Sequence, residues 1–393
     1  MKSISIYLLS FFLFSGYYIG LEVIIATGYS EMSRFYSIPI RILQFSMMIY
    51  LSRFIILEKI KIHYFSAFLF FSILYLFKVF YTDNQLYTSE FMPLKKSWQE
   101  YIFYFVIMTF LPLISFASFD FRKYSKVVFN AIILSTFLLS LISIYFYSDA
   151  IGSGVGRISL LVYQDSDTES TISPLALSYG SALGISLCIY ALLFQKNTFY
   201  KKVYLFLVIS SALVIFFLGA SRGSLIAIIA SVAAMVYYSN FKRKILLMVL
   251  SIISIPLLIN IADRIGSNLF ERAENTLEGG DSSGRNELWA DAWNHFTDYP
   301  LLGGRIEVSG IYPHNMFLET LMATGLVGFL LFVPPMIKSF INASKLVKND
   351  KVFLIALILL INGFSQNMFT GAIYNMMVLS SGMGILLSSK NIK

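Results

Sequence analysis

Charged residues are scarce in this sequence. They make up 13% of its 393 residues, whereas an ordinary soluble domain carries about 25%. Cysteine is scarcer still, because Cys188 is the single cysteine of the sequence and lies inside an apolar run. One cysteine excludes a disulfide framework and a thiolate metal cluster. Hydrophobic residues reach 57%. The composition therefore indicates an integral membrane protein and not a soluble enzyme.

The apolar residues form long continuous runs. Runs of about 17 to 25 residues are long enough to cross a bilayer core as helices. They lie near residues 4–26, 36–57, 63–81, 101–119, 127–148, 172–194, 203–219, 222–239, 245–262, 314–337, 352–369 and 372–389. The first run lacks an A-x-A-like cleavage site and is expected to be a retained span. We therefore expect an all-α polytopic membrane protein with about twelve transmembrane helices, of which the last two form either two crossings or one re-entrant hairpin.

Basic residues outnumber acidic ones, 30 to 22, and they are unevenly distributed. Most of them lie in alternate connections between the runs. These are Lys2, Lys59, Lys61, Arg122, Lys123, Lys126, Lys196, Lys201, Lys202, Lys242, Arg243, Lys244, Lys338, Lys345, Lys348, Lys351, Lys390 and Lys393. Short basic loops stay in the cytoplasm, so both termini are predicted to be cytoplasmic. The excess of basic residues therefore indicates the membrane topology of the chain and does not predict a nucleic-acid partner.

The whole chain, 1–393, is expected to form a single transmembrane domain with a large loop at 263–313 on the non-cytoplasmic side. Between a turn at Gly284 and the helix-ending Pro300, this loop has an apolar stripe at helical spacing. Its members are Leu288, Trp289, Ala292, Trp293 and Phe296. Such a short amphipathic helix is expected to lie in the membrane interface. Arg285 falls in its first turn, either as a lipid-phosphate contact or as a functional residue.

His314 and Glu319 are candidate proton-transfer residues. Pro313 is typical of the first helical position, which would place His314 among amides without an intrahelical acceptor. A histidine there tends to stay neutral and able to accept a proton, although an interfacial capping role fits the same motif. Glu319 shares a helix face with Asn315 at membrane depth, and a buried carboxylate in a span is a functional candidate.

Arg222 lies in a short turn between two predicted spans, within Ser221-Arg222-Gly223. The short connection holds the side chain at the membrane surface, where a guanidinium is suited to bidentate phosphate recognition. The alternative is a lipid-phosphate anchor. Lys78 lies near a span end and is expected to be a structural residue that extends toward the interface.

Together these motifs resemble the superfamily of O-antigen polymerases and O-antigen ligases. The motifs are Ser221-Arg222-Gly223, Gly284-Arg285 with Trp289, Pro300 with Gly303, and His314-Asn315 followed by Gly325 and Gly328. Their order and spacing match over about residues 205–335, and the multi-span layout covers the chain. Arg305 stands where the family often has the second glycine of a G-x-G turn, so the local turn differs or the site gains a positive charge.

The resemblance implies roles for particular residues. The expected catalytic residues are Arg222, Arg285 and His314, with Glu319 as an alternative base, and the expected substrate-binding residues are Arg305, Asn315, Tyr312 and Trp289. No metal ligand is expected, because His63 and His295 lack partners at metal spacing, and no cofactor is implied.

The implied function is a glycosyltransferase that joins undecaprenyl-pyrophosphate-linked repeat units at the periplasmic face of the bacterial inner membrane. Its partners are the lipid-linked glycan donor and acceptor, membrane lipid and, in such systems, a chain-length regulator. The polymerase is favoured by the Tyr312-Pro313-His314-Asn315 context. The alternatives are an O-antigen ligase, which transfers the glycan to lipid A–core, and a lipid-linked oligosaccharide flippase. A flippase should carry charges through the mid-membrane, whereas arginine and histidine here concentrate in the far-side loops.

Overall fold

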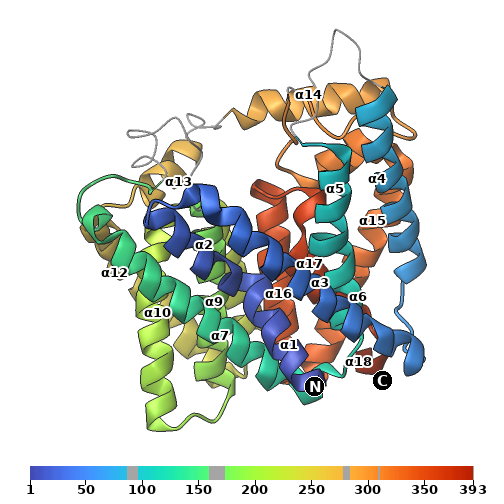
Figure 1. Ribbon diagram of the computed structural model, residues 1–393. Coiled ribbons are helices and arrows are strands. Elements are labelled where there is room, and N and C mark those ends of the chain that lie inside the picture. Colours follow the sequence, from blue (N-terminus) through green and yellow to red (C-terminus); the bar gives the residue numbers. More distant parts are fainter. Residues whose placement is uncertain (86–95, 159–172, 278–283, 309, 393) are drawn as a thin grey trace. The chain divides into compact units, whose positions relative to one another are not determined.

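The computed structural model describes residues 1–85, 96–158, 173–277, 284–308 and 310–392 (Figure 1). Helices make up the regular structure of these residues, which confirms the all-α polytopic class. The α-helices are α1 (Lys2–Phe11), α2 (Tyr17–Ala26), α3 (Ser33–Leu57), α4 (Phe65–Gln85), α5 (Trp98–Phe105), α6 (Leu111–Ala117), α7 (Phe121–Phe146), α9 (Pro174–Phe194), α10 (Phe199–Gly219), α11 (Arg222–Tyr237), α12 (Phe241–Ile265), α13 (Leu269–Leu277), α14 (Arg285–Asp298), α15 (Met316–Asn349), α16 (Leu354–Phe369), α17 (Met377–Leu387) and α18 (Ser389–Ile392). The π-helical turns η1 (Phe12–Gly16) and η3 (Val106–Phe110) and the 3-10 turns η2 (Ser30–Met32), η4 (Ser148–Ala150), η5 (Lys351–Phe353) and η6 (Ile373–Asn375) connect several of them.

The number of full-length spans differs from the expected twelve. Among the described residues, 10 helical segments are long and apolar enough to cross a membrane. The runs at 222–239 and 372–389 form α11, of 16 residues, and α17, of 11 residues. At 1.5 Å per residue these helices rise only about 24 and 17 Å, less than the ~30 Å of a bilayer core. The apolar runs predicted from the sequence are present as helices, but apolar composition did not predict where α11 and α17 end.

The chain divides into two compact units. The first unit comprises Met1–Met47, Lys123–Asp281 and Val347–Asn362. In it α9 packs along α10 and α11, which also contact α12. Two glycines of α9 permit close packing within this unit, since a Cβ at Gly184 would lie 2.4 Å from Thr136 Cγ2 and one at Gly180 would lie 3.1 Å from Ser15 Oγ.

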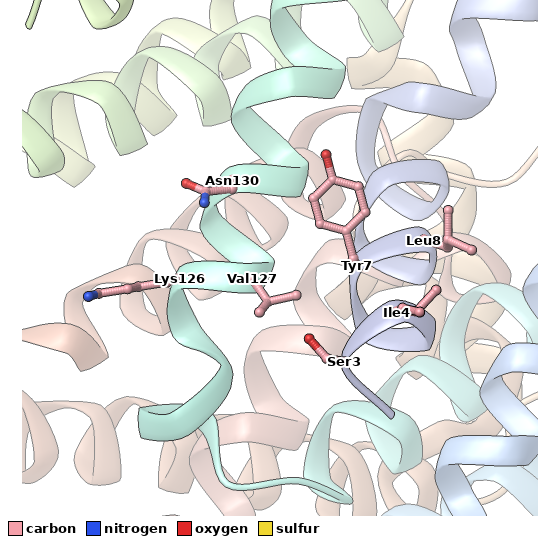
Figure 2. A pocket seen from close by; sticks show the side chains of 7 residues that line it. All are labelled: Ser3, Ile4, Tyr7, Leu8, Lys126, Val127 and Asn130. Carbon is pink, nitrogen blue, oxygen red and sulfur yellow. The ribbon is translucent and has the colours of Figure 1, made fainter. Parts of the chain in front are cut away.

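A cavity of about 330 Å³ lies in the first unit where α1 and α7 begin (Figure 2). It is lined by Ser3, Ile4, Tyr7, Leu8, Lys126, Val127 and Asn130. A second, mostly apolar cavity of about 530 Å³ lies in the other unit, between the end of α3 and the starts of α4 and α6. Neither is lined by a candidate site residue, so neither cavity marks the chemistry predicted from the sequence.

The second unit comprises Met48–Arg122, Ser282–Leu346 and Gly363–Lys393. Here α17 packs closely on α6, and a Cβ at Gly384 would lie 2.2 Å from the Leu113 carbonyl oxygen. The short α14 runs crosswise to α4 and α5 at one end of the unit (Figure 1). In this position Trp289 of α14 contacts Pro313, just before the start of α15.

Helix α15 is broken at Gly325, whose backbone is non-helical with φ 63° and ψ −162°. The break frees two amides, and the segment after α14 accepts their hydrogen bonds: Leu326 N donates to Pro300 O at 2.9 Å and Val327 N to Leu301 O at 3.1 Å. Gly303, with φ +65°, allows the same segment to lie against α15. A Cβ on either glycine would meet backbone atoms at 2.4–2.5 Å, which explains why both positions require glycine.

The break also separates Glu319 from the longer part of α15. The part of α15 from Leu326 to Asn349 rises about 36 Å and is long enough by itself to cross a bilayer. Glu319 precedes the break and belongs to the short first part of the helix. Its burial, at 1% exposed, therefore results from protein packing in the second unit and does not require membrane depth.

Lys78 and His295 hold the segment after α14 in place. Lys78 Nζ donates to the Gly303 carbonyl at 2.9 Å, and His295 Nε2 accepts the Arg305 amide at 2.9 Å. Lys78 is 8% exposed, and its bond to Gly303 gives it the structural role expected from the sequence. That its side chain extends toward the interface stays a prediction. His295 likewise has a structural role that its position in the sequence did not reveal.

Substituting Gly303 with alanine should lower the stability of the second unit. The added Cβ would overlap the backbone of Ala323 and Thr324 and would impose a positive φ on a non-glycine residue. We expect a loss of about 2 kcal/mol or more, measured as a fall in Tm in detergent. Gly28→Ala is the matched control, because Gly28 has φ +84° but nothing within 4 Å of the added Cβ. Equal effects of the two substitutions would contradict the close approach.

Acidification should loosen the same segment. Burial, followed by the charge of Arg305, lowers the pKa of His295 below its ordinary 6.5, and a protonated ring cannot accept the Arg305 amide. A lowered folded-state pKa means that this contribution is fully present above about pH 6.5 and is lost as the pH falls through the folded pKa. Between about pH 7.5 and pH 5, Tm should fall more steeply for the natural chain than for His295→Gln, whose amide oxygen accepts without titrating. Parallel curves of Tm against pH would show that the bond between the Arg305 amide and His295 does not hold this segment.

Candidate functional site

Arg222 is the first residue of α11 in the first unit. Ala220, two residues earlier, is buried and takes the left-handed conformation that ends α10. The Arg222 Nη1 donates to the Arg272 carbonyl at 3.2 Å, and Arg272 Nη1 in turn donates to the Ala220 carbonyl at 2.9 Å. Arg157 Nε donates to the carbonyl of Gly219 at 3.1 Å. Three guanidinium groups therefore gather on one turn, and only Arg222 was predicted from the sequence.

Arg285 is the first residue of α14 in the second unit, after Gly284 in the left-handed conformation. This confirms the predicted helix, which ends at Asp298 just before Pro300. A cation at the start of a helix is disfavoured by the macrodipole, whereas an anion there is stabilised by the free amides. Arg222 and Arg285 share this placement, which is the local arrangement expected where an anionic group binds between an arginine and helix amides.

The apolar stripe of α14 packs partly on its own unit. Ala292 is buried and contacts Val308 and Met322 in a small core, while Trp293 remains 49% exposed. Trp289 Nε1 donates to the Pro313 carbonyl at 2.8 Å. The helix that carries Arg285 is therefore tied directly to the segment that carries His314.

His314 lies outside the helix in which it was expected to follow Pro313 as the second residue. Its φ is +54°, and α15 begins at Met316. Asn315 is the capping residue, because its Oδ1 accepts the amides of Phe317 at 3.0 Å and Leu318 at 3.2 Å. Asparagine is among the best N-terminal caps, so its preference overrides the placement suggested by Pro313. The Asn315 side chain therefore bonds backbone amides of α15. His314, with its strained positive φ, lies just before this cap.

The ring of His314 has a defined partner. Its Nδ1 lies 3.0 Å from the Thr370 carbonyl oxygen. A carbonyl only accepts hydrogen bonds, so the contact requires a proton on Nδ1. In the neutral ring the lone pair then belongs to Nε2, which is the arrangement required for accepting a proton from a substrate hydroxyl.

Tyrosines that the sequence did not single out surround this histidine. The Tyr312 ring lies 4.4 Å from the His314 ring and 5.6 Å from that of Tyr374. The Tyr312 and Tyr374 rings meet edge to face, and burial raises the pKa of both hydroxyls. Tyr101 lies 5.0 Å from Tyr374, ring to ring, and donates to the buried carboxylate of Glu307. The neutral phenols form a rigid polar wall beside His314.

Both carboxylate oxygens of Glu319 have partners inside the second unit. Oε2 accepts the Ile373 amide at 2.9 Å, and Oε1 accepts the Tyr75 hydroxyl at 3.5 Å. Ile373 belongs to the connection between α16 and α17, the same connection that begins with Thr370. Glu319 and His314 therefore contact one loop from two sides.

The second unit brings together most of the residues predicted for the site. Trp289, Tyr312, His314, Asn315 and Glu319 share direct contacts or neighbours. Arg305 is 9% exposed, and burial lowers its pKa; its amide is bonded to His295. Among the described residues, no group of three or more His, Cys, Asp or Glu side chains is arranged to hold a metal ion.

Residues 205–333 match the family described as O-antigen ligase. The matched segment runs from α10 into α15 and contains Arg222, Arg285 and His314. A comparison with curated proteins gave no match. The match of this segment supports the resemblance of the chain to the superfamily of O-antigen polymerases and O-antigen ligases.

Proposed function

We propose that this chain is a glycan polymerase that joins undecaprenyl-pyrophosphate-linked repeat units at the periplasmic face of the bacterial inner membrane. The bond between His314 Nδ1 and the Thr370 carbonyl carries the proposal, because it leaves Nε2 as the proton acceptor of the neutral ring. A histidine fixed in one tautomer is suited to general-base catalysis on a sugar hydroxyl. The match of residues 205–333 supports the class of reaction.

In the proposed reaction a hydroxyl oxygen of one lipid-linked glycan attacks the anomeric carbon of another. The new carbon–oxygen bond forms while the bond from that carbon to the phosphate oxygen breaks. The bonding electrons leave with undecaprenyl pyrophosphate, and the hydroxyl proton passes to His314 Nε2. The donor already holds an activated phosphoester bond, so the transfer needs no nucleotide, cofactor or metal.

Arg222 and Arg285 are assigned to the phosphates of the donor. A guanidinium presents a planar pair of donors that matches phosphate oxygens. Each arginine opens a helix, α11 or α14, whose first amides also favour an anion. These fixed groups would stabilise the charge that develops on the leaving pyrophosphate, and electrostatic stabilisation of this kind usually contributes more to the rate than any other single effect.

The acceptor is the point on which polymerase and ligase differ. The Tyr312-Pro313-His314-Asn315 context and the Ser221-Arg222-Gly223 form resemble polymerases, which extend one lipid-linked glycan with another. The second candidate carries the description of the matching family: an O-antigen ligase, which transfers the glycan to lipid A–core. Both use the same donor and the same roles for the arginines and the histidine.

Alanine at His314, Arg285 or Arg222 should each reduce glycan transfer about 100-fold or more. The assay uses the purified full chain in lipid nanodiscs with a presented lipid-linked repeat, and it measures new glycosidic bonds. Arg264→Ala is the matched control, since Arg264 is an exposed arginine in the last turn of α12. Normal transfer by well-folded His314→Ala protein would rule out the proposed base.

A further inference from the structure

The connection between α16 and α17 lies outside the segment that matches the family. It begins at Thr370 and includes η6, and the match ends at residue 333. This connection nevertheless contacts three candidate site residues. Thr370 O accepts from His314, Ile373 N donates to Glu319, and the Tyr374 ring packs edge to face on that of Tyr312. Part of the site is thus built by a loop for which the family match provides no information.

Two side chains hold this loop by its backbone. Glu319 Oε2 accepts the Ile373 amide at 2.9 Å. Thr109 Oγ1 donates to the Ile373 carbonyl at 2.7 Å and accepts the Met376 amide at 3.1 Å. Both peptide groups of Ile373 are therefore fixed three residues from the carbonyl that holds His314. A shift of this backbone would move that carbonyl away from Nδ1.

The surroundings of Glu319 do not suit a base that meets substrate. The side chain is 1% exposed, and both oxygens contact protein groups, Ile373 N and the Tyr75 hydroxyl. By contrast, a carboxylate that accepts a buried backbone amide fixes the position of that backbone, because an amide without an acceptor is costly to bury. The contacts of Glu319 are those of a structural acceptor.

We propose that Glu319 is a positioning residue: it fixes the α16–α17 loop and, through the Thr370 carbonyl, the tautomer and orientation of His314. The role of His314 as base rests on the function proposed above. The placement of the loop by Glu319 does not rest on it. Glu319 therefore acts on catalysis through backbone geometry and takes no proton from the acceptor sugar.

Three substitutions in the full chain test this role. Glu319→Ala removes the acceptor of the Ile373 amide. Glu319→Gln keeps an oxygen that accepts this amide but cannot act as a base. Thr320→Val is the matched control, since Thr320 is the next residue, is equally buried, and bonds only within its helix, to Met316 O at 2.6 Å.

Two measurements are made on each variant in nanodiscs: hydrogen–deuterium exchange of the peptide containing residues 370–375, and glycan transfer. Glu319→Ala should exchange faster in this peptide and lose about 10- to 100-fold in rate, the effect of a misplaced catalytic group. Glu319→Gln should restore both protection and most of the rate, and Thr320→Val should leave both unchanged.

Each outcome has one meaning. If Glu319→Gln is protected in the loop but as inactive as Glu319→Ala, Glu319 is itself the base and the positioning role is wrong. If exchange in the loop is the same in all variants, Glu319 does not hold it. If the natural chain transfers no glycan but Glu319→Ala still exposes the loop, the function proposed for the chain fails while the placement of the loop stands.

Discussion

The second unit depends on the hydrogen bonds between the segment after α14 and the backbone of α15 at its break. Gly325 interrupts the helix, and Pro300 and Leu301 supply the carbonyls that its next turn has lost. This exchange of backbone hydrogen bonds leaves a short helical piece ahead of the break. Asn315, the cap of this helical piece, and His314 lie at its start. The position of the candidate base therefore depends on the packing of Gly303 and Gly325, more than ten residues away.

The three residues expected to act on the donor and acceptor share one structural setting. Arg222 and Arg285 each begin a helix, and His314 precedes the cap of a third. Free amides at helix starts favour negative charge, so the proposed anionic leaving group suits this setting. In the proposed function the arginines would supply charge, and the histidine, fixed at Nδ1, would supply a lone pair.

The sequence predicted the parts of this arrangement that depend on local pattern. The membrane class followed from apolar runs, α14 from its apolar stripe, and the order of motifs from short signatures within residues 205–333. Two local predictions competed at Pro313 and Asn315, and the cap prevailed because Asn315 accepts two amides at once. Two of the twelve predicted spans, α11 and α17, are apolar helices that end short of the length of a bilayer core, and apolar composition alone does not show where a helix ends.

Contacts distant in sequence were not predictable. Lys78 holds Gly303 across 225 positions, and Thr370 holds His314 across 56. Neither Thr370 nor Ile373 has a distinctive side chain in this role, since both act through the backbone. Tyr374 was one of 25 tyrosines, and nothing in its local sequence distinguished it from those that pack against lipid.

The central claim is that the chain polymerises lipid-linked repeats, and surface lipopolysaccharide from a strain lacking this chain tests it most directly. We expect, on a gel, lipid A–core that carries a single repeat, because polymerisation is lost while ligation continues. Bare core with long glycans retained on the carrier lipid would contradict the claim and identify a ligase. An unchanged ladder would also contradict it for O-antigen and would direct the search to another exported glycan.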